Sequence, residues 1–326
     1  MLDSPLLKCC GLNSVIIDKH ISIWRLLKII WLRLLIMLLI AVVGALVVLE
    51  VGEDYIFFSA VVPSILGTAL SIFLGFRTNS AFDRWMKARG YWSDILSASE
   101  NFSLALARVD GEAYLNRETG KSSIIAEKTM TRMIRRTIAW AWCLNFQLKD
   151  MPPLKGLEKY LDPQEYTILK TFENPALKML YNQSRDFRIA MRENQFTDGE
   201  HFEIVTMLRD MLKAQNSCEG LRTTPFPTHY TFFTDVFIWM LVVLMAFSLP
   251  SVDSIGYFSI FAVVLTGWVF SMINGIGSYM EEPFVDNRNV IPMDALSRKL
   301  ERSLLQIALE DKHIPPEITP KDGALY

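Results

Sequence analysis

The chain has 326 residues, of which 51% are hydrophobic, and its formal net charge is −2. Its mean hydropathy is slightly positive, at +0.24. This composition is too apolar for a typical soluble protein and too polar for a chain buried entirely in lipid, so it favours a protein with one part in a membrane and another in water. The near-neutral net charge excludes no class of partner. The distribution of charge along the chain is more informative.

The cysteines and histidines form no recognisable metal-binding or disulfide pattern. The four cysteines are the adjacent pair Cys9 and Cys10 and the distant Cys143 and Cys218, and the four histidines are scattered. No CxxC pair or Cys/His cluster has the spacing of metal ligands. We therefore expect reduced thiols and neither a metal nor a cofactor. Acylation is a second possible role for the Cys9–Cys10 pair.

Four apolar runs predict four transmembrane helices. Residues 29–49 carry a single charge, Arg33, and as a helix would be about 32 Å long, enough to cross a hydrocarbon core of about 30 Å. The runs 56–76 and 257–280 are uncharged, and the run 236–250 is short unless the aromatic residues before it are included. Backbone groups in lipid must satisfy their own hydrogen bonds, so each run should be a helix.

The positive charges predict the orientation of these helices. All 33 Lys and Arg residues lie in 1–33, 77–222 or 288–321, and the two short links within the hairpins carry none. Because positive residues accumulate on the cytoplasmic side, both termini and the long middle segment should lie in the cytoplasm. About 28 polar or mixed residues precede the first run, which argues against a cleavable signal, so we expect a multi-pass protein of the cell (inner) membrane.

The predicted fold is therefore an all-α membrane protein with four transmembrane helices and a helical cytosolic domain. Its expected parts are an N-terminal segment 1–28, helices 1 and 2 in 29–76, a cytosolic domain 77–231, helices 3 and 4 in 232–280, and a C-terminal segment 281–326.

The middle segment has the pattern of a helical domain throughout. No proline occurs between residues 64 and 151, so one rod should run from 68 to 108, about 60 Å long. Apolar residues recur along it at nearly 3.5-residue spacing, from Trp85 through Ser99 to Val109. The apolar stretch 137–148 is too short for a span and suits a buried cytosolic helix.

Other signals divide the rest of the chain. Asp162-Pro163 predicts a helix start, and 198–221 is amphipathic. Pro225 and Pro227 predict a bent elbow before the third span. The tail after Pro315 is expected to be disordered.

Thr68, Ile72 and Phe76 are four residues apart and share one stripe of the second span. If several copies of this helix surround an axis, the stripe forms stacked apolar collars, which repel water and hydrated ions. Arg77, Asp83 and Arg84 follow and would line or support a polar vestibule. The same spacing is also typical of ordinary helix packing, and from periodicity alone that interpretation is favoured.

Several blocks of this sequence resemble the bestrophin family. They are LGTALSIFLGFRTNSAFDRWMKARGYW (66–92), CEGLRTTPFPTHY (218–230), EEPFVDNRNVIPMDAL (281–296) and WRLLKIIWLRLLIMLLI (24–40). The resemblance implies a homopentameric ion channel, a bestrophin-like pentameric barrel with one central pore. It places a hydrophobic neck at Thr68, Ile72 and Phe76, where Thr68 departs from the bulky apolar residue expected.

The resemblance also implies a second, cytosolic constriction, near Phe202, with Ile204 and Val205 as further candidates within a turn. After the fourth span, Glu281, Glu282 and Asp286 match an acidic cluster that eukaryotic bestrophins use to bind calcium.

This sequence has Asn287, Arg288 and Asn289 where further acids would be needed. Calcium prefers six to eight oxygen ligands, so we predict no calcium gating. Acids at a helix C-terminus oppose the helix dipole, and salt bridges to cytosolic arginines or lysines should compensate.

The resemblance implies passive conduction of small monovalent anions, with more copies of the chain, small inorganic ions and the lipid bilayer as partners and no nucleic acid. A monovalent cation channel of the same architecture remains open, because the outer acids Glu50, Glu53, Asp54 and Asp253 would concentrate cations. A non-conducting membrane scaffold and a membrane-bound enzyme or sensor also remain open. No catalytic motif is present, so no enzyme is predicted.

Overall fold

A computed structural model describes residues 23–51, 59–112, 124–192, 198–252, 255–284, 291–309 and 311–318. Several residues named above lie outside these ranges: Cys9, Cys10, Glu53, Asp54, Asp253 and Asp286–Asn289.

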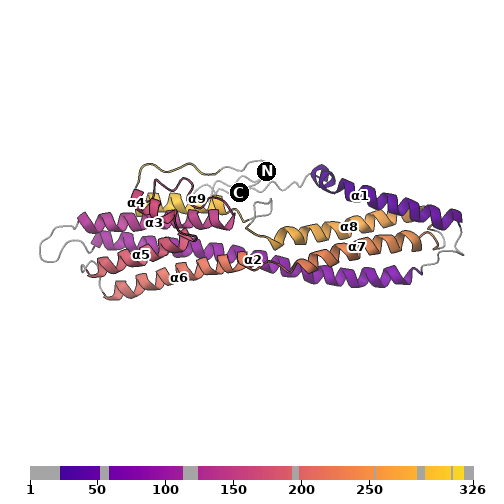
Figure 1. Ribbon diagram of the computed structural model, residues 1–326, viewed down its shortest axis with the longest axis horizontal. Coiled ribbons are helices and arrows are strands. Elements are labelled where there is room, and N and C mark those ends of the chain that lie inside the picture. The colour runs from indigo at the N-terminus through magenta and orange to yellow at the C-terminus, as the bar shows by residue number, and fades with distance from the viewer. Residues whose placement is uncertain are drawn as a thin grey trace, which may run out of the picture.

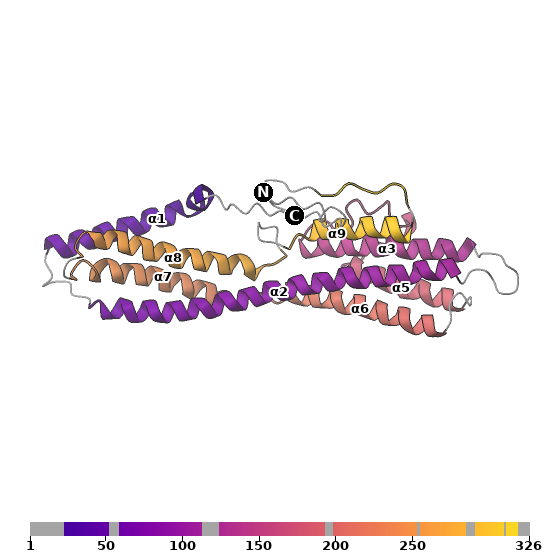
Figure 2. The same cartoon turned by 180° about the vertical axis from the view of Figure 1, so that it is seen from behind.

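The molecule is an elongated bundle built around one long helix (Figures 1 and 2). Its elements are α1 (Ile23–Leu46), the π-helical turn η2 (Val47–Val51), α2 (Val61–Glu112), α3 (Ile124–Leu148), α4 (Pro163–Leu169), α5 (Pro175–Arg192), α6 (Asp198–Thr223), α7 (Thr228–Ser248), α8 (Phe258–Glu281), α9 (Met293–Ser303) and η3 (Leu304–Ala308). Helices α1, α7 and α8 lie at one end, and α3 to α6 and α9 lie at the other. Only α2 runs through both ends, and the described residues include no strand.

The predicted apolar helices are confirmed, since four helices are long and apolar enough to cross a membrane. Small residues let the helices at this end approach closely. A Cβ atom added to Gly44 of α1 would lie only 2.5 Å from the carbonyl oxygen of Ala246 in α7. Gly267 of α8 faces Met37 of α1 in the same way, with 2.8 Å between such an added atom and the sulfur. Close approach of this kind is how helices pack in lipid, where burying apolar surface gives no driving force.

The predicted rod is confirmed, and α2 extends beyond both expected ends, over 52 residues. Its C-terminal half is held by the predicted seam. Ala88, Trp92, Ile95, Phe102 and Leu106 are all fully buried, and Ser99 fills the remaining place by donating a hydrogen bond to the Ile95 carbonyl oxygen (2.7 Å). The seam packs against α3 and α6, so the rod is fixed by side chains far from the membrane end.

The end that carries α3 to α6 and α9 also follows the sequence expectations. The stretch 137–148 forms the second half of α3, and Ile138 to Leu144 are buried in the core of this end. Asp162 caps α4 by accepting a hydrogen bond from the Gln164 amide (3.0 Å). The elbow between α6 and α7 spans residues 224–227, as the two prolines predict. The boundaries proposed between membrane and cytosolic parts stay predictions, because α2 passes through the first of them without a break.

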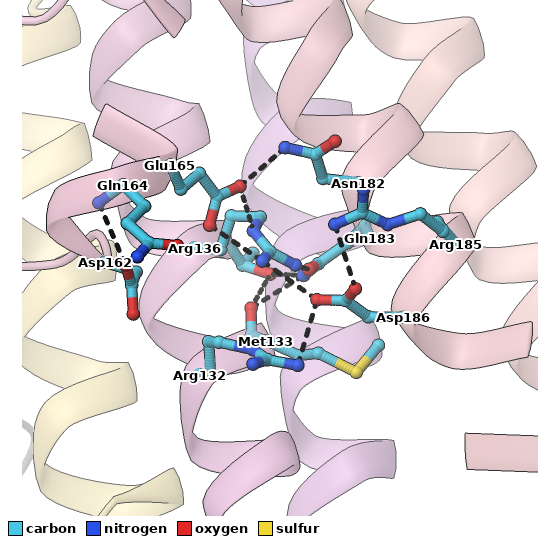
Figure 3. Close-up of polar contacts among 11 residues, drawn as sticks. Arg132, Met133, Arg136, Asp162, Gln164, Glu165, Asn182, Gln183, Arg185 and Asp186 are labelled. Carbon is cyan, nitrogen blue, oxygen red and sulfur yellow. Dashed lines mark hydrogen bonds and ion pairs between the residues drawn. The ribbon is translucent and has the colours of Figure 1, made fainter. Parts of the chain in front are cut away.

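A buried polar network ties α3 to α4 and α5 (Figure 3). The Arg136 side chain is only 3% exposed. Its Nη2 donates to Glu165 Oε2 (2.8 Å) and Asp186 Oδ2 (2.9 Å), and its Nη1 donates to Gln183 Oε1 (2.8 Å). Each charge in this network therefore has a partner, which a buried ionic group requires if it is not to destabilise the fold.

The expectation of disorder after Pro315 is wrong for residues 316–318. Arg302 of α9 donates to the Pro315 carbonyl oxygen (2.6 Å) and pairs with Glu317 (3.5 Å), and Ile318 packs against the core. The polar and proline-rich composition concealed this anchor, because it depends on one arginine side chain of α9.

Candidate functional site

One face of α2 is exposed from Val61 to Asn101. We call it the open line of α2, and every residue on it is exposed: Val61, Ile65, Thr68, Ile72, Phe76, Asn79, Asp83, Met86, Gly90, Ser93, Ser97 and Asn101. These residues recur at steps of three or four, so they follow one side of the helix. The opposite side is packed by Leu70, Leu74 and Ala81 and then by the cytosolic seam.

The open line changes character once, just below Phe76. Above that point it is largely apolar, with Ile72 57% exposed and Phe76 73% exposed. The Thr68 hydroxyl donates to the Ser64 carbonyl oxygen (2.9 Å), so this side chain has already satisfied its donor within the helix. Below Phe76 the line is mostly polar or small, beginning with Asn79 and Asp83. An apolar segment followed by a polar one on the same exposed face is the pattern expected of a pore that widens into water.

Arg77 does not lie on the open line, although it follows Phe76 directly. Its side chain is 1% exposed and faces α8 and α7. Nε donates to Glu281 Oε1 (3.0 Å), and Nη2 donates to Thr231 Oγ1 (3.1 Å) and Ser278 Oγ (2.9 Å). Nη1 donates to Asn274 Oδ1. Of the two roles predicted for Arg77, lining or supporting a vestibule, its position excludes the first. These acceptors hold the side chain on the packed side of α2, where it supports the helix that carries Phe76.

The polar contacts around Arg77 continue to α1. Asn274 Nδ2 donates to Asp235 Oδ1 of α7 (2.8 Å), and Asp235 pairs with Arg33 of α1 (3.3 Å). Charged and amide side chains thus connect all four apolar helices at one level. Sequence reasoning missed Asp235 and Asn274, although a polar residue inside an otherwise apolar run is the signal that should have marked them.

Asp83 and Arg84 separate in the same way as Phe76 and Arg77. Asp83 is exposed on the open line, and no hydrogen bond or ion pair engages it within the described residues. Arg84 is half-buried and donates to the Glu281 carbonyl oxygen (2.7 Å) and the Leu221 carbonyl oxygen (2.6 Å). It therefore caps α8 and ties the end of α6 to α2.

The acidic residue that ends α8 is engaged by an arginine. Glu281 is 8% exposed, and the predicted compensation comes from Arg77 of α2. Glu282 is exposed, and Asp286 lies outside the described residues. Within the part of the chain that the structure describes, no group of three or more His, Cys, Asp or Glu side chains could hold a metal ion.

Phe202 is the most exposed of the three candidates for the cytosolic constriction, at 76%, and Val205 is 44% exposed. Ile204 is 1% exposed and belongs to the core, so it is excluded as a lining residue. Periodicity could not choose among neighbours on one turn, because that choice depends on which side of α6 packs against α2 and α5.

Neither described cysteine has the environment of a reactive thiol. Burial raises the pKa of Cys218 in α6 to about 12, and the nearby Asp94 and Glu219 carboxylates act in the same direction. Burial also raises the pKa of Cys143. Both are free thiols, and a thiol is nucleophilic only as the thiolate.

These features define an all-helical membrane protein whose longest helix exposes one apolar-to-polar line. The profile of the bacterial and fungal bestrophin protein family matches residues 20–306. The chain belongs to this family, as its sequence blocks suggested.

Curated relatives and a solved structure agree with this membership. The protein YneE of Salmonella typhi and that of Escherichia coli (strain K12), each named a voltage-dependent anion channel-forming protein, are 28% identical over 257 residues, which is 79% of this chain and 79% of each relative. The protein alr2987 of Nostoc, also named a voltage-dependent anion channel-forming protein, is 27% identical over 252 residues, which is 75% of this chain and 75% of that relative. The crystal structure of a bestrophin homologue from Klebsiella pneumoniae superimposes with a TM-score of 0.77 at 22% identity, over 86% of this chain and 98% of that one, and so shares the fold.

Proposed function

We propose that this chain forms a homopentameric channel in the cell (inner) membrane and conducts small monovalent anions passively. Five copies of α2 would surround one pore, with Thr68, Ile72 and Phe76 as its hydrophobic neck and Phe202 as a second constriction. The observation that carries this proposal is the open line of α2, which is exposed at every turn and largely apolar in its membrane half.

The exposed side of α1 offers a useful contrast, because it has the character of a lipid-facing surface. Large apolar side chains project from several sides of α1, with Trp31 57%, Leu35 52% and Leu39 62% exposed. The membrane half of α2 instead mixes exposed apolar residues with the exposed Ser64 and Thr68. A partly hydroxylated surface suits a neighbouring copy or a lumen better than acyl chains.

Anions are favoured over cations by the names of the relatives, each of which is an anion channel-forming protein. The Phe76 ring would present its positive edge to an ion in the neck. Of the outer acids that would favour cations, Glu50 accepts a hydrogen bond from Tyr257 (2.9 Å), and the remaining three lie outside the described residues. A sodium or potassium channel of the same architecture is the second candidate, and it differs only in the sign of selectivity.

The distribution of Lys and Arg supports placing both termini and the helical end in the cytoplasm. A non-conducting scaffold would need no continuous open line. Enzymatic activity finds no support in the names of the relatives, which are those of channels.

The decisive experiment replaces two residues of the neck. Ile72→Ala together with Phe76→Ala removes exposed side chains and should leave folding nearly unchanged while raising single-channel conductance severalfold in a planar bilayer. The matched control is Leu35→Ala with Leu39→Ala on α1, which removes similar exposed apolar area. Reversal potentials in a salt gradient fix the sign of selectivity, and native mass spectrometry counts the copies. Unchanged conductance in the neck variant would reject the pore.

A further inference from the structure

Helix α6 has an open line of its own, next to that of α2. Phe202, Arg209, Lys213, Asn216 and Gly220 are all exposed. At 100° per residue they fall within about 60° of one another around the helix. The opposite side of α6 is buried through Ile204, Met211, Ala214 and Cys218. Helices α2 and α6 pack along each other, so the two exposed lines lie on neighbouring helices.

The two cationic side chains on this line, Arg209 and Lys213, have no partner among the described residues. Neither Arg209 nor Lys213 makes a side-chain hydrogen bond or an ion pair with any residue that the structure describes. Both lie on one open patch of the α6 surface together with Leu212, Asn216 and Ser217. By contrast, the guanidinium groups of Arg77, Arg84 and Arg136 each donate hydrogen bonds to residues of other helices.

The acids near these cations lie to one side. Glu203 and Asp210 are exposed on α6, but they fall about 80° and about 60° around the helix from Lys213, and both lie farther than that from Arg209. On α2, Asp83 and Asp94 are balanced in number by Lys87 and Arg89 on the flanks. The centre of the α6 line is therefore a place where positive charge is concentrated and unpaired among the described residues.

We propose that Arg209 and Lys213 form an electrostatic filter for small monovalent anions in the cytosolic vestibule. This inference rests on the proposed function, because it requires the open lines to face a shared lumen. The two residues lie about 10 and 16 Å from Phe202 along the helix axis, toward the membrane end. Rings of Arg and Lys in a lumen with low-dielectric walls concentrate anions and repel cations, so the charge preference is set here and the neck supplies the barrier.

The test removes the two charges and measures the reversal potential of the reconstituted full-length channel in a potassium chloride gradient. Arg209→Gln with Lys213→Gln should lower the chloride-to-potassium permeability ratio by about threefold or more. The control Lys155→Gln with Arg188→Gln removes two exposed cations that lie off both lines, and the ratio should stay unchanged. Asp83→Asn should move the ratio in the opposite direction, and Asp210→Asn should move it less than Asp83→Asn does.

Two further measurements separate charge from folding. Arg209→Lys keeps the charge and should keep the ratio. The effect of the double variant should shrink between 0.1 M and 1 M salt, because the Debye length falls from about 10 Å to about 3 Å. If the double variant does not conduct, each single variant is expected to show part of the shift.

An unchanged ratio in a conducting double variant, or in both single variants, rejects the filter. The pore itself stands in that case if the neck variant still changes conductance. If the neck variant changes nothing, the proposed function fails and the filter fails with it.

Discussion

The two sides of α2 differ in whether their charged side chains are paired. On the packed side, Arg77 is 1% exposed and directs its donors to α7 and α8. On the open line, Asp83 lies fewer than two turns further along and has no such partner among the described residues. The contrast teaches that position around the helix, and not position along it, decides whether a charge stabilises the fold or remains available to ions.

The largest loss of stability should come from removing a buried charge that is fully paired within the fold. Arg136→Met leaves the buried Glu165 carboxylate without its cation and leaves Asp186 with only the half-exposed Arg132 (3.2 Å) and Arg185 (3.5 Å). Removing one partner of such a buried network costs about 3 to 5 kcal/mol. We expect the melting temperature of the purified protein in detergent to fall strongly. Arg188→Met, on the exposed side of α5, is the control and should leave the melting temperature unchanged. Equal melting of the two variants would show that the network is not structural.

Arg77→Gln should have the next largest effect. Glutamine keeps some hydrogen bonding but leaves the buried Glu281 carboxylate without a cation, a loss of about 2 to 3 kcal/mol. Asp83→Asn, on the open line, should change stability by less than about 0.5 kcal/mol. Thermal unfolding of both variants in one detergent measures the difference. If Asp83→Asn proved as destabilising as Arg77→Gln, the distinction between the two sides of α2 would be lost.

The helices of this molecule and their buried faces were predictable from its sequence because the patterns that indicate them are local. Apolar runs, the seam from Ala88 to Leu106 and the Asp162 cap each depend on residues close together in the chain. The role of Arg77 depends on Glu281, which is 204 residues away, and no local pattern shows that pairing. The choice of Phe202 over Ile204 likewise required knowing which side of α6 is packed.

Replacing Phe202 should affect the stability of the protein less than the two changes above. Phe202→Ala shortens a side chain that is 76% exposed, so unfolding should be almost unaffected. If the residue narrows the vestibule, the permeability of a large anion such as gluconate relative to chloride should rise severalfold, whereas chloride conductance should change little. Ile204→Ala is the opposite case, because it should destabilise the protein by about 2 to 4 kcal/mol through a core cavity. Bilayer recordings and melting curves of the two variants therefore give opposite results if α6 is oriented as described.

Calcium should have the smallest effect, namely none. Both oxygens of Glu281 are already engaged, one by Arg77 and one by the Thr231 hydroxyl (3.3 Å), so this carboxylate belongs to the packed side and cannot serve as a free ligand. Among the described acids of the cluster this leaves Glu282, which offers far fewer oxygens than the six to eight that calcium prefers. Currents recorded before and after chelation of calcium with EGTA should superimpose. Loss of current on chelation would mean that Glu281 exchanges its arginine for a metal ion, and the charge that we assign to structure would then have a gating role as well.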